Sequence, residues 1–158
     1  MKRTLSHLPK HKREELCYIT EFVRSKSKYA DMLILFGSYA RGDWVEDTYV
    51  EDGVTYEYKS DYDILVISEN ETIAGRYRYW YEIAQKAARG PVKTRITIIA
   101  HDIEHINNSL KKGQYFFTDI KKRRHPSLRF GQIQARSARQ ARPETAKKHG
   151  KTILQRMV

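Results

Sequence analysis

Two aspartates stand at the start of an apolar segment in the middle of the chain. Asp61 and Asp63 are two positions apart, and the apolar segment 62–67 is typical of a buried strand. Since alternate residues of a strand point to the same face, we expect both carboxylates on one face, about 6.6 Å apart along the strand. Carboxylates at that separation can share hard cations, and phosphoryl and nucleotidyl transfer use two such ions to hold the attacking and leaving oxygens in line. The pair is therefore a candidate metal site for phosphate chemistry.

A second polar pair ends another apolar segment. Gly37 and Ser38 directly follow the segment 32–36. A glycine at such a strand end lets a ligand approach the backbone closely, because no Cβ intervenes. Ser38 adds a hydroxyl and a backbone N–H at an expected helix N-terminus, where phosphate is electrostatically favoured. Either pair alone is more often an ordinary strand end, but the two together, each beside an apolar strand, favour a functional site.

The hydrophobic periodicity predicts the elements that position these residues. The order of these elements along the chain predicts an α/β (α+β) fold, with helices packed on a small mixed β-sheet and a hairpin inserted between the first two core strands. The elements are a helix over 11–27, a strand over 32–36, a hairpin with strands 48–50 and 54–58, a strand over 62–67, a helix over 74–88, a strand over 94–99 and a helix from Asp102 towards Lys112.

Both longer helices have an apolar face that predicts which side chains they bury. The segment Arg76–Tyr81 also mixes basic and aromatic residues as single-strand-binding surfaces do, but its helical spacing favours a core face. The residues expected in the core are Leu16, Ile19, Phe22 and Val23 in the first helix and Tyr77, Trp80, Tyr81, Ala84 and Ala88 in the second.

The positive charge is concentrated in the last part of the chain. The net charge is +11, but residues 1–122 carry 20 Lys/Arg and 18 Asp/Glu, a net charge of only +2. Residues 123–158 carry 10 Lys/Arg and one acid, a net charge of +9. The body of the domain is therefore not expected to bind nucleic acid, whatever the isoelectric point of the whole chain.

Cysteine usage and hydropathy indicate the compartment. Cys17 is the single cysteine, which excludes an internal disulfide and suits a reducing cytoplasm, and we expect it to be buried on the apolar face of the first helix. No apolar stretch approaches the roughly 18–20 residues of a membrane helix, and the basic N-terminus has no apolar signal region. These features predict a cytoplasmic protein with no membrane partner.

Three segments, GSYARG, SDYDILV and KKGQYFFTDIKK, resemble a known group of enzymes. An apolar strand, Gly-Ser, a spacer and Asp-x-Asp between apolar residues resemble the nucleotidyltransferase superfamily that contains DNA polymerase β and kanamycin nucleotidyltransferase. The chain is most similar to small bacterial nucleotidyltransferases that are paired with or fused to HEPN domains. The resemblance covers roughly residues 28–122.

This resemblance implies a polymerase β palm-like fold and transfer of a nucleoside monophosphate from an NTP, expected to be ATP, to a protein or small-molecule hydroxyl. Gly37, Ser38 and Arg41 would bind the nucleotide. Asp61 and Asp63 would be catalytic and would hold two Mg²⁺ ions. A HEPN-type toxin, or a fused HEPN domain, is the expected partner. The alternative function is a weak or inactive antitoxin-like module that binds nucleotide and a HEPN-type partner.

The chain departs from the family pattern at two places. First, 22 residues separate Ser38 from Asp61, more than in minimal members, and they contain the predicted hairpin. Second, many active members carry a third carboxylate on the following strand, as the base that activates the acceptor hydroxyl. The strand 94–99 has no acid. Asp102 follows it and is the candidate for that role, although its position also suits a helix cap.

Residues 123–158 form a separate segment that is basic and without clear periodicity, which is typical of a disordered tail. Relatives of the resembled group continue from IKK into an apolar strand such as EGILLYDSG. Codons can be chosen for Arg124–Gln134 that encode GILLYDSGKF when read one base later. We therefore hypothesise that the nucleotidyltransferase domain is 1–122 and that the tail is a frameshifted reading. Sequencing the gene across these codons tests this, and an intact frame through position 158 contradicts it.

Overall fold

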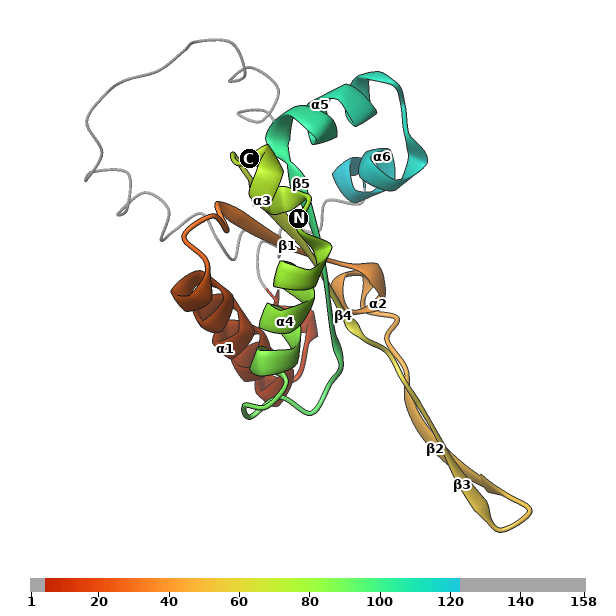
Figure 1. The fold of residues 1–158 in the computed structure, drawn as a ribbon. Coiled ribbons are helices and arrows are strands. Elements are labelled where there is room, and N and C mark those ends of the chain that lie inside the picture. The colour runs from red at the N-terminus through yellow and green to blue at the C-terminus, as the bar shows by residue number, and fades with distance from the viewer. Residues whose placement is uncertain (1–4, 123–158) are drawn as a thin grey trace.

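The computed structural model describes residues 5–122, and Figure 1 shows a small sheet flanked by helices, with a long hairpin that projects away from it. In chain order the elements are η1 (Leu5–His7), α1 (Lys10–Lys26), β1 (Met32–Phe36), α2 (Gly37–Arg41), β2 (Glu46–Glu51), β3 (Val54–Lys59), β4 (Tyr62–Ser68), α3 (Glu71–Ala74), α4 (Tyr77–Ala87), β5 (Ile96–Asp102), α5 (Ile103–Lys111) and α6 (Tyr115–Lys122).

The central sheet has three strands in the order β1-β4-β5. Strand β1 is antiparallel to β4, and β4 is parallel to β5, so the sheet is mixed. The parallel pair needs a crossover connection, which α3 and α4 provide between β4 and β5. The hairpin β2–β3 is a separate two-stranded sheet inserted between β1 and β4. The mixed α+β class, the mixed sheet and the inserted hairpin that the sequence predicts are confirmed.

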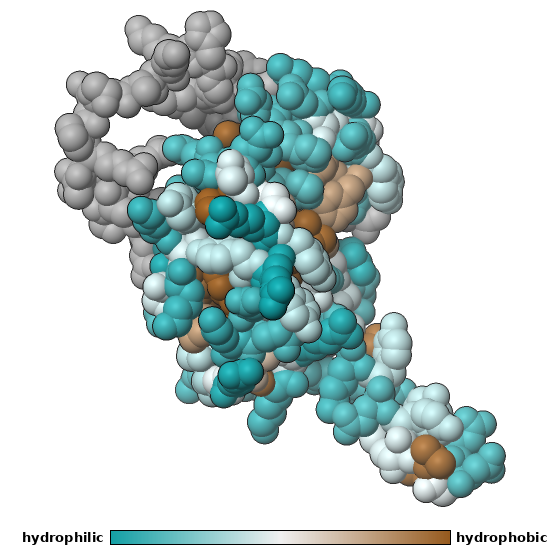
Figure 2. Space-filling model, viewed as in Figure 1, coloured by the Kyte–Doolittle hydropathy of each residue, from teal (hydrophilic) through white to brown (hydrophobic). Residues whose placement is uncertain are grey.

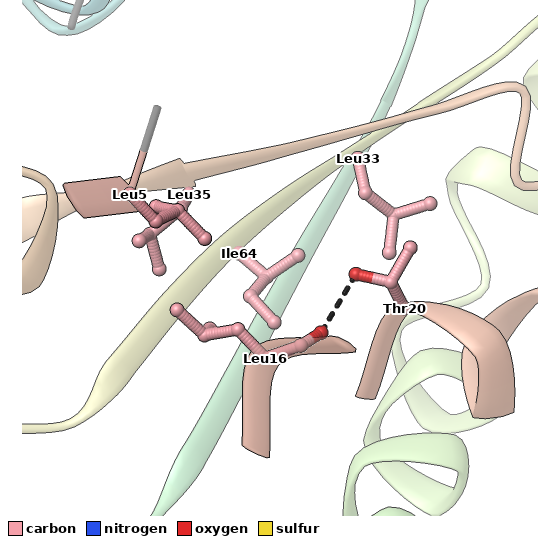
Figure 3. Close-up of a pocket in the computed structure, with 6 residues that line it drawn as sticks. All are labelled: Leu5, Leu16, Thr20, Leu33, Leu35 and Ile64. Atoms are coloured by element: carbon pink, nitrogen blue, oxygen red, sulfur yellow. Dashed lines mark hydrogen bonds between the residues drawn. The ribbon is translucent and has the colours of Figure 1, made fainter. Parts of the chain in front are cut away.

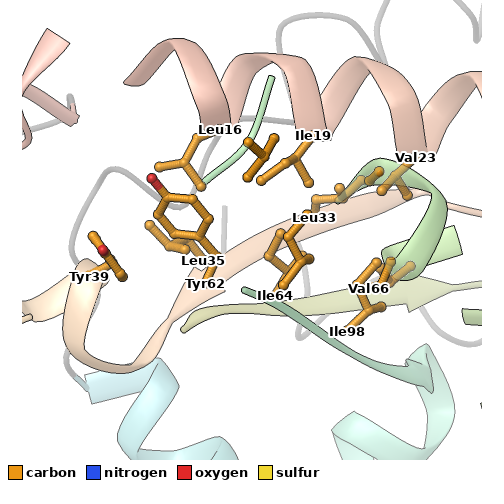
Figure 4. Close-up of a cluster of buried hydrophobic side chains, with 14 of the residues drawn as sticks. Leu16, Ile19, Val23, Leu33, Leu35, Tyr39, Tyr62, Ile64, Val66 and Ile98 are labelled. Atoms are coloured by element: carbon orange, nitrogen blue, oxygen red, sulfur yellow. The ribbon is translucent and has the colours of Figure 1, made fainter. Parts of the chain in front are cut away.

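Helices α1 and α4 cover one face of the sheet and form the larger part of the core. The side chains on this face are aliphatic in the middle and aromatic towards the hairpin, where Tyr39 of α2 and Tyr62 of β4 are both fully buried. Their rings lie 4.5 Å apart. Figure 4 shows how α1 lies over the strands, with Leu16, Ile19 and Val23 pointing towards Leu33, Leu35, Ile64, Val66 and Ile98.

Helices α5 and α6 pack on the opposite face but cover only part of it. A smaller cluster there contains Leu65 and Ile67 of β4 together with side chains from both helices. Asp61 and Asp63 precede these residues on the same face of the chain, because positions two apart share a face. At its near edge α6 places Phe116 edge-on to Phe36, with ring centroids 5.4 Å apart. The part of this face that α5 and α6 cover therefore ends close to the two aspartates.

The second crossover helix differs from its prediction. The expected helix over 74–88 is two helices, α3 and α4, which Gly75 and Arg76 separate. The buried face of α4 consists of Trp80, Ile83, Ala84 and Ala87. Tyr77, Tyr81 and Ala88 are exposed, so the prediction that they belong to the core is wrong. The reason is geometric, since positions i, i+3, i+4 and i+7 counted from Trp80 select Ile83, Ala84 and Ala87 instead.

Helix α1 contains a second correction. Cys17 is exposed, although the sequence predicts it on the buried face. Leu16 and Ile19 define the inward direction, and the residue that follows Leu16 is rotated about 100° away from it. The bounds of the strand predicted over 94–99 also differ, since β5 begins at Ile96 and ends at Asp102.

A small cavity lies in the core between α1 and strands β1 and β4 (Figure 3). Its volume is about 20 Å³, and apolar side chains line it except for Thr20. The Thr20 hydroxyl already donates to the carbonyl of Leu16 at 2.8 Å. A buried water needs two or more polar partners, so this cavity is a packing defect rather than a ligand site.

Two further predictions concern the C-terminal tail and membrane-spanning segments. The predicted tail over 123–158 lies outside the described residues, so its boundary with the domain stays a prediction. Within 5–122, no helix is long and apolar enough to cross a membrane.

The corrected face of α4 can be tested by two alanine substitutions. Trp80 is 1% exposed, and its indole N–H donates to the carbonyl of Ile73 at 2.9 Å. We expect Trp80→Ala to lower the free energy of unfolding by about 3–5 kcal/mol, because it leaves a large cavity. Tyr81→Ala, one position further and half exposed, should change it by about 0.5 kcal/mol or less. Urea unfolding of both variants measures the difference, and equal losses would contradict the assigned face.

Candidate active site

The end of β1 brings Gly37 into direct contact with Asp63. Phe36 pairs with Asp63 across the antiparallel strands, so the next residue of the chain turns over the Asp63 side chain. Gly37 has φ +73°, a left-handed conformation that glycine adopts without strain. A Cβ at this position would overlap the Asp63 carboxylate oxygen Oδ2. Glycine is therefore required here twice, for its backbone conformation and for the space that the carboxylate occupies.

Asp61 lies one residue before β4 and faces the first part of β5. Its carboxylate oxygen Oδ2 accepts a hydrogen bond from Thr97 Oγ1 at 3.4 Å and lies 3.5 Å from Arg95 Nε. Thr97 pairs in register with Asp63, so it lies beside both aspartates on the same face. Arg95 is 80% exposed, and its ion pair with Asp61 therefore contributes little to stability. The two aspartates are together at one end of the central strands, as the sequence predicts.

Burial and the neighbouring charge act on Asp63 in the same direction. Desolvation is the largest cause that raises the pKa of the Asp63 carboxyl, and the negative charge of Asp61 raises this pKa further. The positive charge of Arg41 opposes both effects. In the absence of a cation, the ionised form of Asp63 is thus held at a cost, which a bound divalent ion would relieve.

The other predicted nucleotide-binding residues lie on the short helix α2. Ser38 is partly buried, and its carbonyl accepts the N–H groups of Gly42 and Asp43 at 2.9 and 3.2 Å, which closes the helix. Arg41 ends α2, and its Nε lies 2.9 Å from Asp43 Oδ2. This ion pair holds the guanidinium on the side of the helix where its charge acts on Asp63. Gly37 thus contacts Asp63, the charge of Arg41 acts on Asp63, and Ser38 follows Gly37 in the chain.

Asp102 does not join this site. It pairs with Ser68 at the far end of the β4–β5 ladder, whereas Thr97 pairs with Asp63. Five residues of strand separate the two positions, which corresponds to about 16 Å. The Asp102 carboxylate instead accepts the N–H of His105 at 2.7 Å and caps α5. The helix-cap role is therefore confirmed, and the structure places no carboxylate of Asp102 near the pair.

Thr97 and Arg95 are the site residues that sequence reasoning missed. In the sequence, Thr97 counts only as one β-branched residue among several, and Arg95 as an ordinary surface charge. The signal lies in the register of a parallel pair, which a single sequence does not fix. The position where a third carboxylate would face Asp61 and Asp63 is occupied by the hydroxyl of Thr97.

The donor set fits Mg²⁺ in one specific way. Among residues 5–122, no group of three or more His, Cys, Asp or Glu side chains could hold a metal ion. Mg²⁺ is commonly bound by one or two carboxylates, with waters and substrate phosphates completing an octahedron. Asp61 and Asp63 supply two carboxylates on one face of the strand. The site can therefore accept Mg²⁺ together with a phosphate ligand, but not as a closed protein cage.

Comparison of the chain with protein-family models, with curated proteins and with solved structures gives no significant match in any of the three.

The raised pKa of Asp63 predicts how stability depends on pH without metal. A carboxyl whose pKa is higher in the folded state contributes stability that is present below its unfolded pKa, and this contribution is lost as pH rises through the folded pKa. With a metal chelator present at pH 7, the Asp63→Asn variant should therefore have a higher free energy of unfolding than the natural sequence. This difference in free energy should vanish in acid. Thermal unfolding across pH measures this.

The same comparison with metal supplies the control. At a Mg²⁺ concentration ten times its Kd, the natural sequence should gain about 1.4 kcal/mol, and Asp63→Asn should gain much less. Equal metal-induced gains would show that Mg²⁺ binds elsewhere.

Proposed function

We propose that this protein is an Mg²⁺-dependent nucleotidyltransferase of the polymerase β type, which transfers a nucleoside monophosphate from an NTP to a hydroxyl group. The observation that carries the proposal is the packing of Gly37 against Asp63, with Asp61 beside it. A two-carboxylate cluster at the end of a strand, next to a glycine that leaves the backbone open, suits a metal-bound triphosphate. The mixed sheet with an α1–α4 layer is compatible with the palm-like fold that the sequence motifs imply.

The residues of the chain take distinct roles in this reaction. Asp61 and Asp63 would hold Mg²⁺, which when bound supplies the positive charge that neutralises the triphosphate and aligns the reacting oxygens. Gly37 and Ser38 would accommodate the phosphates against the backbone of α2. Arg41, fixed by Asp43, adds a positive charge on the same side. Arg95 is exposed beside Asp61, and its guanidinium can release the Asp61 carboxylate and pair with a phosphate oxygen instead.

The transfer itself is a substitution at the α-phosphorus. The acceptor oxygen forms a bond to this phosphorus, the bond to the bridging oxygen breaks, and pyrophosphate leaves with the electron pair. The acceptor proton must pass to a base. Thr97 cannot serve as that base, because a neutral hydroxyl is a poor proton acceptor. In the described part of the chain the proton would therefore leave through solvent or through one of the two aspartates.

This missing base supports a second function, that of a nucleotide-binding module with little or no turnover. Such a module would act as an antitoxin-like or regulatory domain that binds a HEPN-type partner. Both functions use the same residues for the metal and the triphosphate. They differ only in whether a label from the α-phosphate is transferred.

The experiment that separates them uses ATP labelled at the α-phosphate, Mg²⁺ and a cell lysate. Transfer of label to a protein or small molecule supports the enzyme. Asp61→Asn combined with Asp63→Asn should lower transfer by about 10³-fold or more, as expected when a metal site is lost. Asp102→Asn is the matched control, because asparagine keeps the helix cap and removes a carboxylate remote from the pair.

Each outcome decides between the candidates. Mg²⁺-dependent binding of ATP without transfer favours the regulatory module. If neither binding nor transfer responds to the double substitution, the proposed site is wrong. A loss of transfer in Asp102→Asn equal to that of the double variant would show that a remote carboxylate takes part.

A further inference from the structure

The hairpin β2–β3 forms an arm, residues 46–59, that the rest of the described chain, residues 5–122, does not cover. Figure 1 shows the arm leaving the sheet beside α2 and extending into solvent. Every residue of its two strands is exposed. A lone two-stranded ribbon is marginally stable in water, so its apolar side chains need a surface to rest on. Figure 2 shows that hydrophobic residues gather towards the far end of the arm.

One face of the arm is aromatic and acidic. Residues that pair directly across the strands share a face, so Tyr49 and Tyr56 lie side by side, and their rings stack at 5.2 Å. Tyr58 lies on the same face opposite Asp47. Glu51 belongs to this face too, at the far end. These tyrosines are 44–66% exposed, whereas Tyr62 in the central sheet is fully buried.

The opposite face has a different composition. It carries Thr48, Val50 and Thr55, together with Glu57, whose carboxylate pairs with Lys59 at 2.8 Å. No aromatic side chain lies on it. The two faces of the arm are therefore chemically distinct, and the aromatic face is the one that offers stacking surfaces beside unpaired acids.

Charge on the arm is opposite to charge on the body. The arm has five Asp/Glu and one Lys, a net charge of −4. The remainder of residues 1–122 has 19 Lys/Arg and 13 Asp/Glu, a net charge of +6. Such an arm repels nucleic acid and anionic lipid, and it attracts basic polypeptide.

The root of the arm is fixed to the body by a buried network. The ammonium group of Lys12 in α1 is bonded to Glu46 Oε1 and donates to Thr94 Oγ1 at 2.8 Å. The Tyr39 hydroxyl donates to Glu46 Oε1 at 3.1 Å. Ser60 closes the ribbon by exchanging hydrogen bonds with the backbone of Val45. The arm therefore leaves the body in a set direction, starting from the helix that carries Gly37 and Ser38.

We infer that the arm is a docking element for an arginine-rich segment of a partner protein. Guanidinium groups stack on tyrosine faces and pair with neighbouring carboxylates at the same time, which the Tyr49–Tyr56 stack between Asp47 and Glu51 permits. Arginine fits better than lysine, because its planar group makes both contacts at once. The inference concerns binding by the arm and does not depend on nucleotidyl transfer.

The test measures binding of two labelled peptides of equal length and charge by fluorescence anisotropy with the full chain. One peptide carries arginine at every second position, and the other carries lysine. The arginine peptide should bind more tightly. Tyr49→Ser with Tyr56→Ser should weaken its binding about tenfold, as the loss of two cation–π contacts implies. Tyr49→Phe with Tyr56→Phe keeps the stacking faces and should retain most of the affinity.

Matched variants separate the arm face from general electrostatics. Thr48→Ala with Thr55→Ala alters the opposite face and should leave binding unchanged. Asp47→Asn with Glu51→Gln should weaken binding and reduce its salt dependence. Equal affinity for both peptides, or equal losses from substitutions on the two faces, would overturn the inference. Arm-dependent self-association of the chain without peptide binding would also overturn it, because the occupant would then be a second copy.

Discussion

The contact between the Asp63 carboxylate and the Cα of Gly37 is the constraint on which the rest of the site depends. It exists because β1 and β4 are antiparallel neighbours in a register that places Phe36 opposite Asp63. A shift of this register by one residue would turn both aspartates into the other face of the sheet, among the buried aliphatic side chains. The apolar residues that fix the register therefore also fix where the charge lies. The same strand register therefore determines both the core packing and the geometry of the site.

The two faces of the sheet divide the tasks of stability and function. The face under α1 and α4 holds the larger core cluster, in which the Tyr62 hydroxyl donates to Glu15 Oε2 at 2.7 Å. Burial and this bond to a carboxylate both raise the pKa of the Tyr62 hydroxyl, so it stays a donor at neutral pH. Among the residues that the structure describes, α5 and α6 cover the opposite face beyond Asp63. A partly open face lets charged groups stay near solvent while the covered face supplies the folding free energy.

How far the sequence determines this structure depends on the range of the interaction concerned. Local signals predict well: Asp52-Gly53 gives the hairpin turn, with φ of 50° and 74°, and Asp102 gives the cap of α5. Signals that need the tertiary partner fail. Tyr81 looks like a core residue in a periodic pattern, yet the sheet meets the face of α4 that contains Ile83. The role of Thr97 depends on the register between β4 and β5, which no local pattern encodes.

Thr97 also limits what the two aspartates can do. A third carboxylate at its position would add a proton acceptor, but it would also add a third negative charge to a pair in which the pKa of Asp63 is already raised. A hydroxyl there adds no negative charge and donates to Asp61. The metal-free site is then easier to fold. Because no third carboxylate is present as a general base, the proposed nucleotide binding makes fewer demands on this arrangement than the proposed turnover does.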